Sequence, residues 1–469
     1  MTTPKLPLIC TLLMGPLLAC SGASADDDGL ESADESDTAG EPAAYEDALD
    51  YVIEQIDAAS YRTLEGRSDA LEAAIEQAQA ELADVADDEE FALLVGRLLA
   101  ALEDGHAQVS LEAGSVESID LPLMWLEGGP VVSRDAGQLQ AGDMVTGIGG
   151  MSADALMDAL ARQVSRDNDH YLRHAAAQRL PRADWLRPMG LVADGEVEVE
   201  VEVERGGQAM AFTLPIVAGL EVSPFPEREF VGYWIEPEND LGVFYLDECV
   251  YGSDFQAALD AFMAEVDAQD IAKIAIDLRR NPGGDVTVAY ALLAYLGQPY
   301  ASFSVSARRS DALLEQAAVY TNADFLALLE SFGVALDGPT IEVPGDALSF
   351  ALGSVVPTPA PELIFSGAVY VLTSPTTYSS AQLFVGQLSD NDLATVVGEP
   401  TGANRDTTGD QLWFEVPESD LRFTLGGSWM TRPDPARGDG PTLPDVSVPT
   451  TAEDLLEGND PQLEQVRAL

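Results

Sequence analysis

Two stretches of the sequence decide the fold, DLRRNPGGD at residues 277–285 and TSPTTYSSAQLF at residues 373–384. Each follows an apolar run with strand character, Ile271–Leu278 for the first and Ala368–Thr373 for the second. Each also leads into a segment with helical periodicity, so both are strand–turn–helix junctions. The same alternation of apolar strands and amphipathic helices continues through residues 230–450, where Leu241–Leu246 is a further expected strand. We therefore expect an α/β core in this part of the chain.

Both junctions contain residue types that suit acyl-transfer chemistry. The paired Gly283 and Gly284 let backbone N–H groups approach a reacting oxygen closely, as an oxyanion hole requires. Ser379 and Ser380 stand at a helix start, where a developing negative charge is stabilised. Each feature alone has an ordinary structural explanation, because Asp285 and serine are good helix N-caps. Their combination in one chain is what points to a catalytic site.

The supply of basic side chains limits which residue can act as a catalytic base. The chain has two lysines, Lys5 and Lys273, and three histidines, His106, His170 and His174. Lys273 lies within an apolar strand-like run, whereas histidine has an ordinary pKa of about 6.5, which suits a base near neutral pH. His170 and His174 have the spacing of one helix face, but no third ligand follows at a useful spacing. We therefore expect no metal site and no cofactor.

A third motif, VVGEPTG at residues 396–402, follows the two junctions. The order D-L-R-x-N-x-G-G, T-x-S-x-A-x-L-F and V-V-G-E-P-T-G resembles that of the tail-specific (C-terminal processing) serine protease family and of the tricorn protease core. The resemblance spans roughly residues 91–450. It implies a core of ClpP/crotonase-like ββα repeats. It also implies a serine-type peptidase that hydrolyses peptide bonds through an acyl-enzyme intermediate.

The resemblance assigns a role to each junction. Ser379 takes the position of the nucleophile, and its own amide with Gly283 or Gly284 forms the oxyanion hole. The family pairs its serine with either lysine or histidine. Where the lysine branch has its base, this sequence has Asn404, and the glutamate typical of that branch is replaced by Gln382. A Ser–Lys dyad is therefore not expected.

The Ser–His branch carries its base in an Asp-Gly-His motif, which Asp104-Gly105-His106 matches. By the same resemblance, the carboxylate that orients the histidine falls just before a Gly-x-x-Pro-Asp stretch, and Asp439 takes that place. Asp410 and Glu415, in the preceding hairpin, are rivals for this role. The predicted triad consists of Ser379, His106 and one of these three carboxylates. Asp439 is the preferred candidate.

Composition and periodicity divide the rest of the chain. The stretch LQAGDMVTGIGG at residues 139–150 looks like part of a PDZ domain, but a Gly-Leu-Gly-Phe carboxylate-binding loop is missing, so peptide binding and scaffolding are both open. An insertion at residues 300–362 carries helical patterns over Ala307–Tyr320 and Ala323–Leu336. The expected domains are a signal peptide (1–20), an acidic disordered linker (21–44), an N-terminal helical domain (45–115), a PDZ-like module (116–218), the protease core (230–450) and a C-terminal tail (451–469).

The start of the chain has the character of a targeting segment. The fourteen residues Leu6–Ala19 are apolar but too few to span a bilayer, which takes about 20. They end in Leu17-Leu18-Ala19-Cys20, which resembles the bacterial lipobox, so Cys20 is the expected lipidation site. An ordinary cleaved signal peptide or an uncleaved anchor is the alternative. Ser21 favours the outer membrane of the cell envelope. Acylation of Cys20 and loss of the signal peptide leave Cys249 alone, so we expect no intramolecular disulfide.

The charge balance excludes one class of function. With 23 Lys and Arg against 81 Asp and Glu, the net charge is −58, and such a surface repels a phosphate backbone, so nucleic acid is not an expected partner. The leading hypothesis is an envelope-anchored serine peptidase that acts on peptides or proteins. The alternative is a catalytically inactive homologue that acts as a peptide-binding lipoprotein, motivated by Gln382, Asn404 and the weak PDZ loop. A small-ester hydrolase with the same triad is a third hypothesis.

Overall fold

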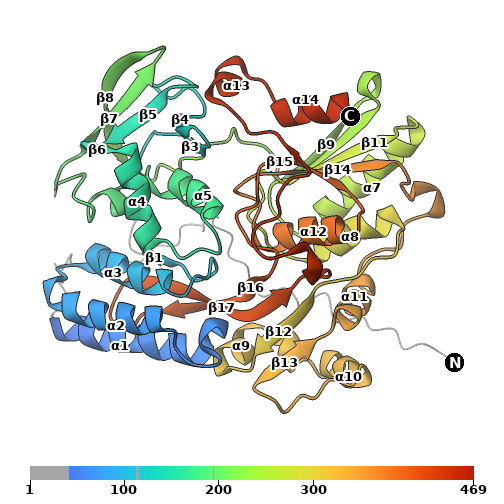
Figure 1. Ribbon diagram of the computed structural model, residues 1–469, viewed down its shortest axis with the longest axis horizontal. Coiled ribbons are helices and arrows are strands. Elements are labelled where there is room, and N and C mark those ends of the chain that lie inside the picture. Colours follow the sequence, from blue (N-terminus) through green and yellow to red (C-terminus); the bar gives the residue numbers. More distant parts are fainter. Residues whose placement is uncertain (1–41, 112–115, 194) are drawn as a thin grey trace, which may run out of the picture.

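The computed structural model describes residues 42–111, 116–193 and 195–469, which form three sheets with helices packed around them (Figure 1). The predicted signal peptide, its Cys20 and most of the acidic segment 21–44 lie outside these described residues. Helix α1 (Pro42–Ala59) begins inside that segment, before the expected start of the helical domain at residue 45. No helix within the described ranges is long and apolar enough to cross a membrane.

A six-stranded sheet forms the centre of the predicted α/β core. All its neighbouring strands are parallel except β9, which pairs antiparallel with β10 at one edge. The sequence predicted β10 and β14 with their observed bounds. In spatial order the strands are β18 (Val446–Ser447), β15 (Thr395–Gly398), β14 (Ala368–Thr373), β11 (Lys273–Asp277), β10 (Leu241–Leu246) and β9 (Val231–Glu236).

Helices cover both faces of this sheet, as its alternating buried side chains require. Phe244 and Ile276 face one side, where they join a core that includes residues of α7 (Ser253–Ala268), α8 (Thr287–Leu296) and α12 (Ser379–Asp390). Val243 and Ala275 face the other side and pack with Leu463 of α14 (Pro461–Ala468). The segment expected as a C-terminal tail therefore supplies part of the core through α14, whereas the short α13 (Ala452–Glu457) before it has no buried residue.

The two junctions meet at one edge of this sheet because β11 and β14 are parallel neighbours. The turn after β11 leads toward α8, and the turn after β14 leads into α12. Hydrogen bonds join the two turns directly. The Tyr378 N–H donates to the Asn281 carbonyl at 3.1 Å, and the Thr377 hydroxyl donates to the Leu278 carbonyl at 2.9 Å. The glycine pair and the predicted nucleophile therefore share one place in the fold.

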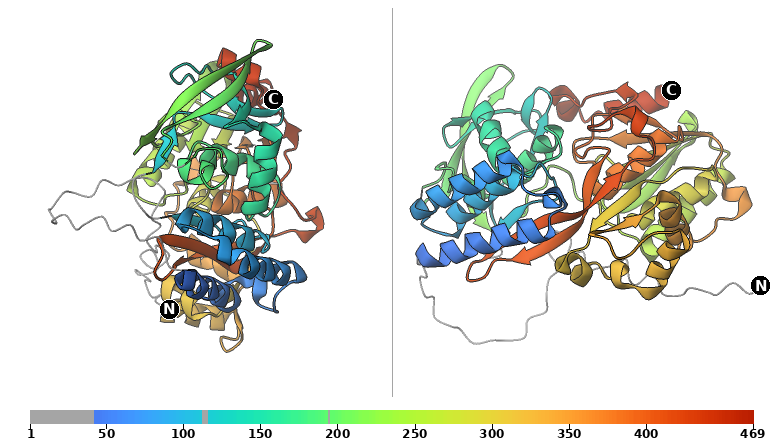
Figure 2. Two further views of the ribbon diagram at one scale, coloured as in Figure 1. Left: turned by 90° about the vertical axis from the view of Figure 1, so that its left-hand side faces the viewer. Right: turned by 60° about the horizontal axis from the view of Figure 1, so that its bottom comes forward.

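A second, five-stranded sheet begins beside the N-terminal helices and extends into the insertion (Figure 2, right). Its long hairpin of β16 (Thr407–Glu415) and β17 (Leu421–Thr431) pairs at one end with β1 (Val109–Leu111). At the other end it pairs with β12 (Ser304–Arg308), which continues to β13 (Thr340–Val343). The helical pattern expected over Ala307–Tyr320 is therefore wrong at its start, where the chain is a strand. The helices of the insertion are α9 (Asp311–Gln316), α10 (Ala323–Ser331) and α11 (Gly345–Gly353).

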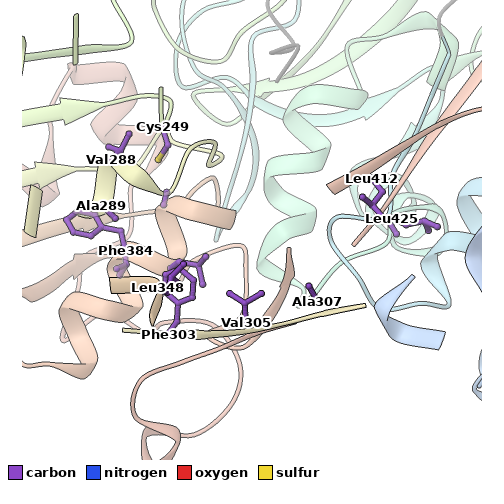
Figure 3. Packing of buried hydrophobic residues seen from close by; sticks show 14 of the residues in the cluster. Cys249, Val288, Ala289, Phe303, Val305, Ala307, Leu348, Phe384, Leu412 and Leu425 are labelled. Atoms are coloured by element: carbon purple, nitrogen blue, oxygen red, sulfur yellow. The ribbon is translucent and has the colours of Figure 1, made fainter. Parts of the chain in front are cut away.

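One hydrophobic core runs from the N-terminal helices to the central sheet. Helices α1, α2 (Asp69–Glu81) and α3 (Asp88–Ala100) contribute to the same buried cluster as the hairpin and the central sheet. Figure 3 shows part of this cluster, from Leu412 and Leu425 of the hairpin through Val305 to Val288 and Phe384 beside the junctions. This shared core fixes the loop after α3 relative to the hairpin and the junctions.

The third sheet has seven strands and a separate hydrophobic core. Valine and glutamate alternate over Glu196–Glu204, as in a strand with one exposed face, and β7 (Glu198–Arg205) forms there with Val199 and Val201 buried. The other strands are β2 (Glu117–Ile119), β3 (Leu123–Leu126), β4 (Gly129–Val132), β5 (Met144–Ile148), β6 (Met151–Ser152) and β8 (Gln208–Ala218). Its helices are α4 (Ala153–Gln163), α5 (His170–Arg179) and α6 (Ala183–Leu186). The assignment of this region as a PDZ-like module stays a prediction.

Candidate active site

Ser379 lies at the first position of α12 in a strained backbone conformation. Its φ of +47° is in the left-handed region, which a residue with a side chain rarely adopts. The strand–turn–helix junction holds it there, with Tyr378 as the helix N-cap. Across the turn, a Cβ on Gly283 would lie 2.6 Å from the Ser379 Cβ, so no residue with a side chain fits at position 283. The first junction therefore leaves room for the serine of the second.

His106 lies against this serine, although the two residues are 273 positions apart in the sequence. The Nε2 atom of the imidazole is 3.1 Å from the Ser379 Oγ, which is within reach for direct proton transfer. The histidine is buried at the turn between α3 and β1. Its backbone N–H donates to the Asp104 Oδ1 at 2.8 Å. The structure thus brings together the serine and the histidine that the sequence singled out.

The other ring nitrogen, Nδ1, is 3.1 Å from the Thr408 hydroxyl and 3.9 Å from the Asp104 Oδ1. The Thr408 hydroxyl donates its single proton to that same carboxylate oxygen. Its oxygen can therefore act toward the ring as an acceptor, which puts the imidazole proton on Nδ1. This tautomer leaves Nε2 unprotonated and free to accept the proton of the Ser379 hydroxyl.

The Asp104 carboxylate, which accepts the Thr408 hydroxyl, is fully buried. Its Oδ2 accepts the Gly426 N–H at 3.2 Å. A Cβ on Gly426 would lie 2.6 Å from the Thr408 Cβ and 2.8 Å from the Asp104 Oδ2, so the glycine makes space for both side chains. The hairpin of β16 and β17 therefore contributes a hydroxyl and a backbone amide to the histidine loop.

A second carboxylate, that of the half-buried Asp167, lies on the same side of the ring. Its Oδ1 accepts the Gly105 N–H at 3.1 Å. Its Oδ2 accepts the Thr407 hydroxyl at 2.8 Å and the Tyr378 hydroxyl at 3.3 Å. Burial raises the pKa of Asp167, an effect that the nearby His106 opposes. Burial, together with Asp167, also holds the pKa of Tyr378 well above its usual range, so Tyr378 is a neutral hydroxyl.

The predicted oxyanion donors divide into engaged and available groups. The Gly283 N–H donates to the Asn281 Oδ1 at 2.8 Å, so it is already used within the loop. Among the described residues, the N–H groups of Gly284, Ser379 and Ser380 have no hydrogen-bond partner. Sequence reasoning did not identify the Ser380 amide as a donor, although the first amides of any helix are unsatisfied.

The three candidate carboxylates for the triad lie elsewhere. Asp439 is exposed, and within the described part of the chain no hydrogen bond or ion pair joins it to the histidine ring. Asp410 accepts the Tyr320 hydroxyl at 2.6 Å, and Glu415 pairs with Arg422 at 2.8 Å. The structure therefore does not bring Asp439 to His106, and its two rivals are occupied by other partners.

Other basic side chains do not compete with His106. The Lys273 Nζ donates to the carbonyl of Arg467 in α14 at 3.2 Å. Asn404 donates to the Asp167 carbonyl at 3.0 Å and so supports the site without providing a base. His174 Nδ1 lies 3.2 Å from the Thr376 Oγ1, and burial lowers its pKa to about 4. Within the described ranges no cluster of three or more His, Cys, Asp or Glu side chains could hold a metal ion.

The fold and this site define the chain as a serine-type peptidase. A strained serine at the edge of an α/β sheet faces a histidine across 3.1 Å, beside unsatisfied backbone amides. Residues 242–430 match the model of peptidase family S41, a family of tail-specific proteases. The family resemblance expected from the motifs is therefore confirmed for this part of the chain.

Two solved structures of mature CPAF share this fold over nearly the whole chain. Mature CPAF matches with a TM-score of 0.64 and 16% identity, over 91% of this chain and 97% of that one. Mature CPAF in complex with lactacystin gives the same TM-score and identity, over 91% and 98%. The photosystem II D1 C-terminal processing protease matches with a TM-score of 0.41 and 16% identity, over 89% and 98%. No curated protein matches the sequence.

Proposed function

We propose that this protein hydrolyses peptide bonds through an acyl-enzyme intermediate, with Ser379 as the nucleophile and His106 as the general base. The observation that carries the proposal is the 3.1 Å distance between the His106 Nε2 and the Ser379 Oγ. The serine oxygen attacks the scissile carbonyl carbon while its proton passes to Nε2. The C–N bond then breaks, Nε2 returns the proton to the leaving amine, and water activated by the same nitrogen hydrolyses the ester.

We assign the orienting carboxylate to Asp104, acting through the Thr408 hydroxyl, rather than to Asp439. Two features support this assignment. The hydroxyl contacts both the Nδ1 atom and the carboxylate, and the carboxylate is fully buried, where its charge is least screened. A negative charge at this position stabilises the imidazolium that forms when the serine loses its proton.

For the oxyanion hole, the free amides of Gly284, Ser379 and Ser380 are the available donors. Gly283 has a different part in this proposal. Its lack of a side chain lets the loop approach the serine, and its own amide holds the turn through Asn281. Asn281 is in turn anchored by its donated hydrogen bond to the Leu246 carbonyl at 2.9 Å.

Cleavage of a peptide library by purified variants tests the mechanism. Ser379→Ala and His106→Ala should each abolish cleavage, because residual catalysis without a triad member is smaller by at least about 10⁴-fold. Ser253→Ala is the matched control, since Ser253 is exposed at the start of α7. Full cleavage by Ser379→Ala would refute the proposal.

An intact wild-type protein that binds peptides without cleaving them would favour the inactive homologue, which neither the family nor the Ser–His distance supports. Turnover of short esters without peptide cleavage would favour the ester hydrolase.

We further propose that the protein is anchored to the bacterial envelope through a lipid on Cys20, in the outer membrane. The support is the Leu17-Leu18-Ala19-Cys20 sequence at the end of an apolar run. Metabolic labelling with a radioactive fatty acid tests this directly. The wild-type protein should carry the label and sediment with outer membranes, and Cys20→Ala should lose both properties. An unlabelled wild-type protein would refute the lipid anchor.

A further inference from the structure

We propose that Asp167 is a positioning residue for His106, acting through the Tyr378 hydroxyl, so that the region carrying the seven-stranded sheet completes the catalytic machinery. The proposal rests on the proposed function, because it concerns proton transfer by the same histidine. Asp167 lies between α4 and α5, and its side chain reaches out of that region to three other segments.

The hydrogen-bond directions around Tyr378 carry the argument. The phenol has one proton, which it donates to the Asp167 Oδ2 at 3.3 Å. Its oxygen lies 3.4 Å from the His106 Nδ1 and can act there as an acceptor. The Thr408 hydroxyl lies 3.1 Å from the same Nδ1 atom and donates its proton to the Asp104 carboxylate. The Nδ1 proton therefore lies between two hydroxyls, each of which donates to a carboxylate: the buried Asp104 or the half-buried Asp167.

Packing holds the phenol in this position. A Cβ on Gly105 would lie 2.0 Å from the Tyr378 Oη, so the glycine of the Asp-Gly-His motif is the space that the hydroxyl occupies. The Tyr378 ring centre is 5.1 Å from that of His106 and 4.9 Å from that of Tyr171 in α5. The tyrosine is thus held between the histidine loop and the seven-stranded region.

The segment that carries Asp167 is fastened to the core on both sides. The Asn168 side chain donates to the Gly402 carbonyl and to the Asn404 Oδ1, both at 3.0 Å. Asn404 returns a hydrogen bond to the Asp167 carbonyl at 3.0 Å, and the Ser165 hydroxyl accepts the Asp104 N–H at 3.1 Å. The carboxylate therefore reaches the site only while this segment is docked.

The raised pKa of Asp167 distinguishes a role in catalysis from a role in stabilising the fold. Burial raises the pKa of Asp167, so keeping its carboxylate ionised at neutral pH costs folding free energy. The ionisable groups that act on it are His106, which opposes this shift, and Asp104, which adds to it. Tyr378 is influenced by Asp167, Tyr171 and Asp104. A neutral side chain of the same shape would avoid this cost in folding free energy, whereas the negative charge stabilises the imidazolium that forms during catalysis.

The sign of the stability effect follows from this raised pKa. A carboxyl whose pKa is raised by folding binds its proton more tightly in the folded state, so stability falls as the pH rises from its unfolded toward its folded pKa. Asp167→Asn removes this loss and keeps an oxygen and the approximate shape. We therefore expect its unfolding temperature at neutral pH to equal or exceed that of the wild type.

The test measures peptide cleavage from pH 5 to 9 and the unfolding temperature for Asp167→Asn, Tyr378→Phe, the double variant and Asp169→Asn. We expect Asp167→Asn to lower kcat roughly tenfold, well below the loss of about 10⁴ for a triad aspartate. The acid limb of kcat/KM should move to lower pH, because a negative charge near the imidazolium is lost. Asp169→Asn makes the same change on an exposed neighbour, whose side chain is 86% accessible, and should leave the profile unaltered.

The double variant should be no slower than the slower single variant, since both changes break one chain of contacts. An unchanged kcat and pH profile in Asp167→Asn would overturn the proposal, as would a loss of activity matched by a fall in unfolding temperature. Ser379→Ala and His106→Ala separate this from the proposed function. If either retains activity, the proposed function fails and this inference with it. If both are inactive while Asp167→Asn behaves as wild type, only this inference fails.

Discussion

The two sides of the His106 ring are built in different ways. On the Nε2 side, backbone geometry positions the reacting group. A strained turn presents Ser379, and Gly283 and Gly284 let the neighbouring loop approach it. On the Nδ1 side, four segments far apart in the chain contribute side chains. They are Asp104, Asp167, Tyr378 and Thr408. The reacting atoms are therefore set by local turns, and the support of the base is set by tertiary packing.

This difference has a consequence for function. A turn keeps its geometry wherever its strand and helix form, so the serine side is rigid once the central sheet has folded. The Nδ1 side depends on the docking of the hairpin and of the segment around Asp167, each of which belongs to another sheet. Changes on the two sides should therefore differ in size and in pH dependence.

The largest effect on the Nδ1 side is expected from Asp104→Asn. The asparagine keeps the size of the side chain but removes the buried charge, and it can donate toward Thr408 so that the tautomer of His106 reverses. We expect kcat to fall by about 10³–10⁴-fold with little change in KM. Steady-state kinetics on a fluorogenic peptide measure this. A loss below tenfold would mean that another carboxylate orients the histidine.

Thr408→Val should have a smaller effect. It removes the hydroxyl that joins Nδ1 to the Asp104 carboxylate, and it leaves both groups buried without that partner. A hydrogen bond to a charged group, such as the imidazolium of the transition state, contributes about 1.5–3 kcal/mol, so its loss corresponds to roughly 10–150-fold in kcat. Thr408→Ser restores the hydroxyl and should recover most of the activity. Equal activities of the valine and serine variants would contradict the relay through this hydroxyl.

The smallest effect is expected from Asp439→Asn, which replaces the carboxylate that the family motif favoured. Asp439 is exposed and makes no described contact with the ring, so kcat should change less than about twofold. The same kinetic assay, run beside Asp104→Asn, decides between the two carboxylates. A loss larger than that of Asp104→Asn would restore Asp439 to the triad.

The sequence was informative where function depends on local structure. The apolar runs at Leu241–Leu246 and Ala368–Thr373 predicted two central strands with their observed bounds. The helical pattern over Ala307–Tyr320 was misleading because a strand ends at Arg308 and a helix begins at Asp311, so two periodicities overlap within a few residues. Tertiary pairing with β17 decides that the first part is a strand.

The same distinction applies to the site. Ser379 and His106 stand in motifs whose glycines are explained by close approaches, and the structure brings the two residues together. Thr408 and Asp167 have no local signal, since a threonine at a strand start and an aspartate in a loop are common. Their importance arises from hydrogen bonds to residues 302 and 62 positions away, respectively, which no local pattern encodes.

The central claim is that Ser379 is activated by His106, and covalent labelling tests it most directly. The purified protein is treated with a fluorophosphonate, and the modified residue is mapped by mass spectrometry in the wild type and in His106→Ala. The account predicts one adduct on Ser379 in the wild type, and a labelling rate reduced by several orders of magnitude in the variant. Labelling of another serine, or equal rates in both proteins, would contradict it.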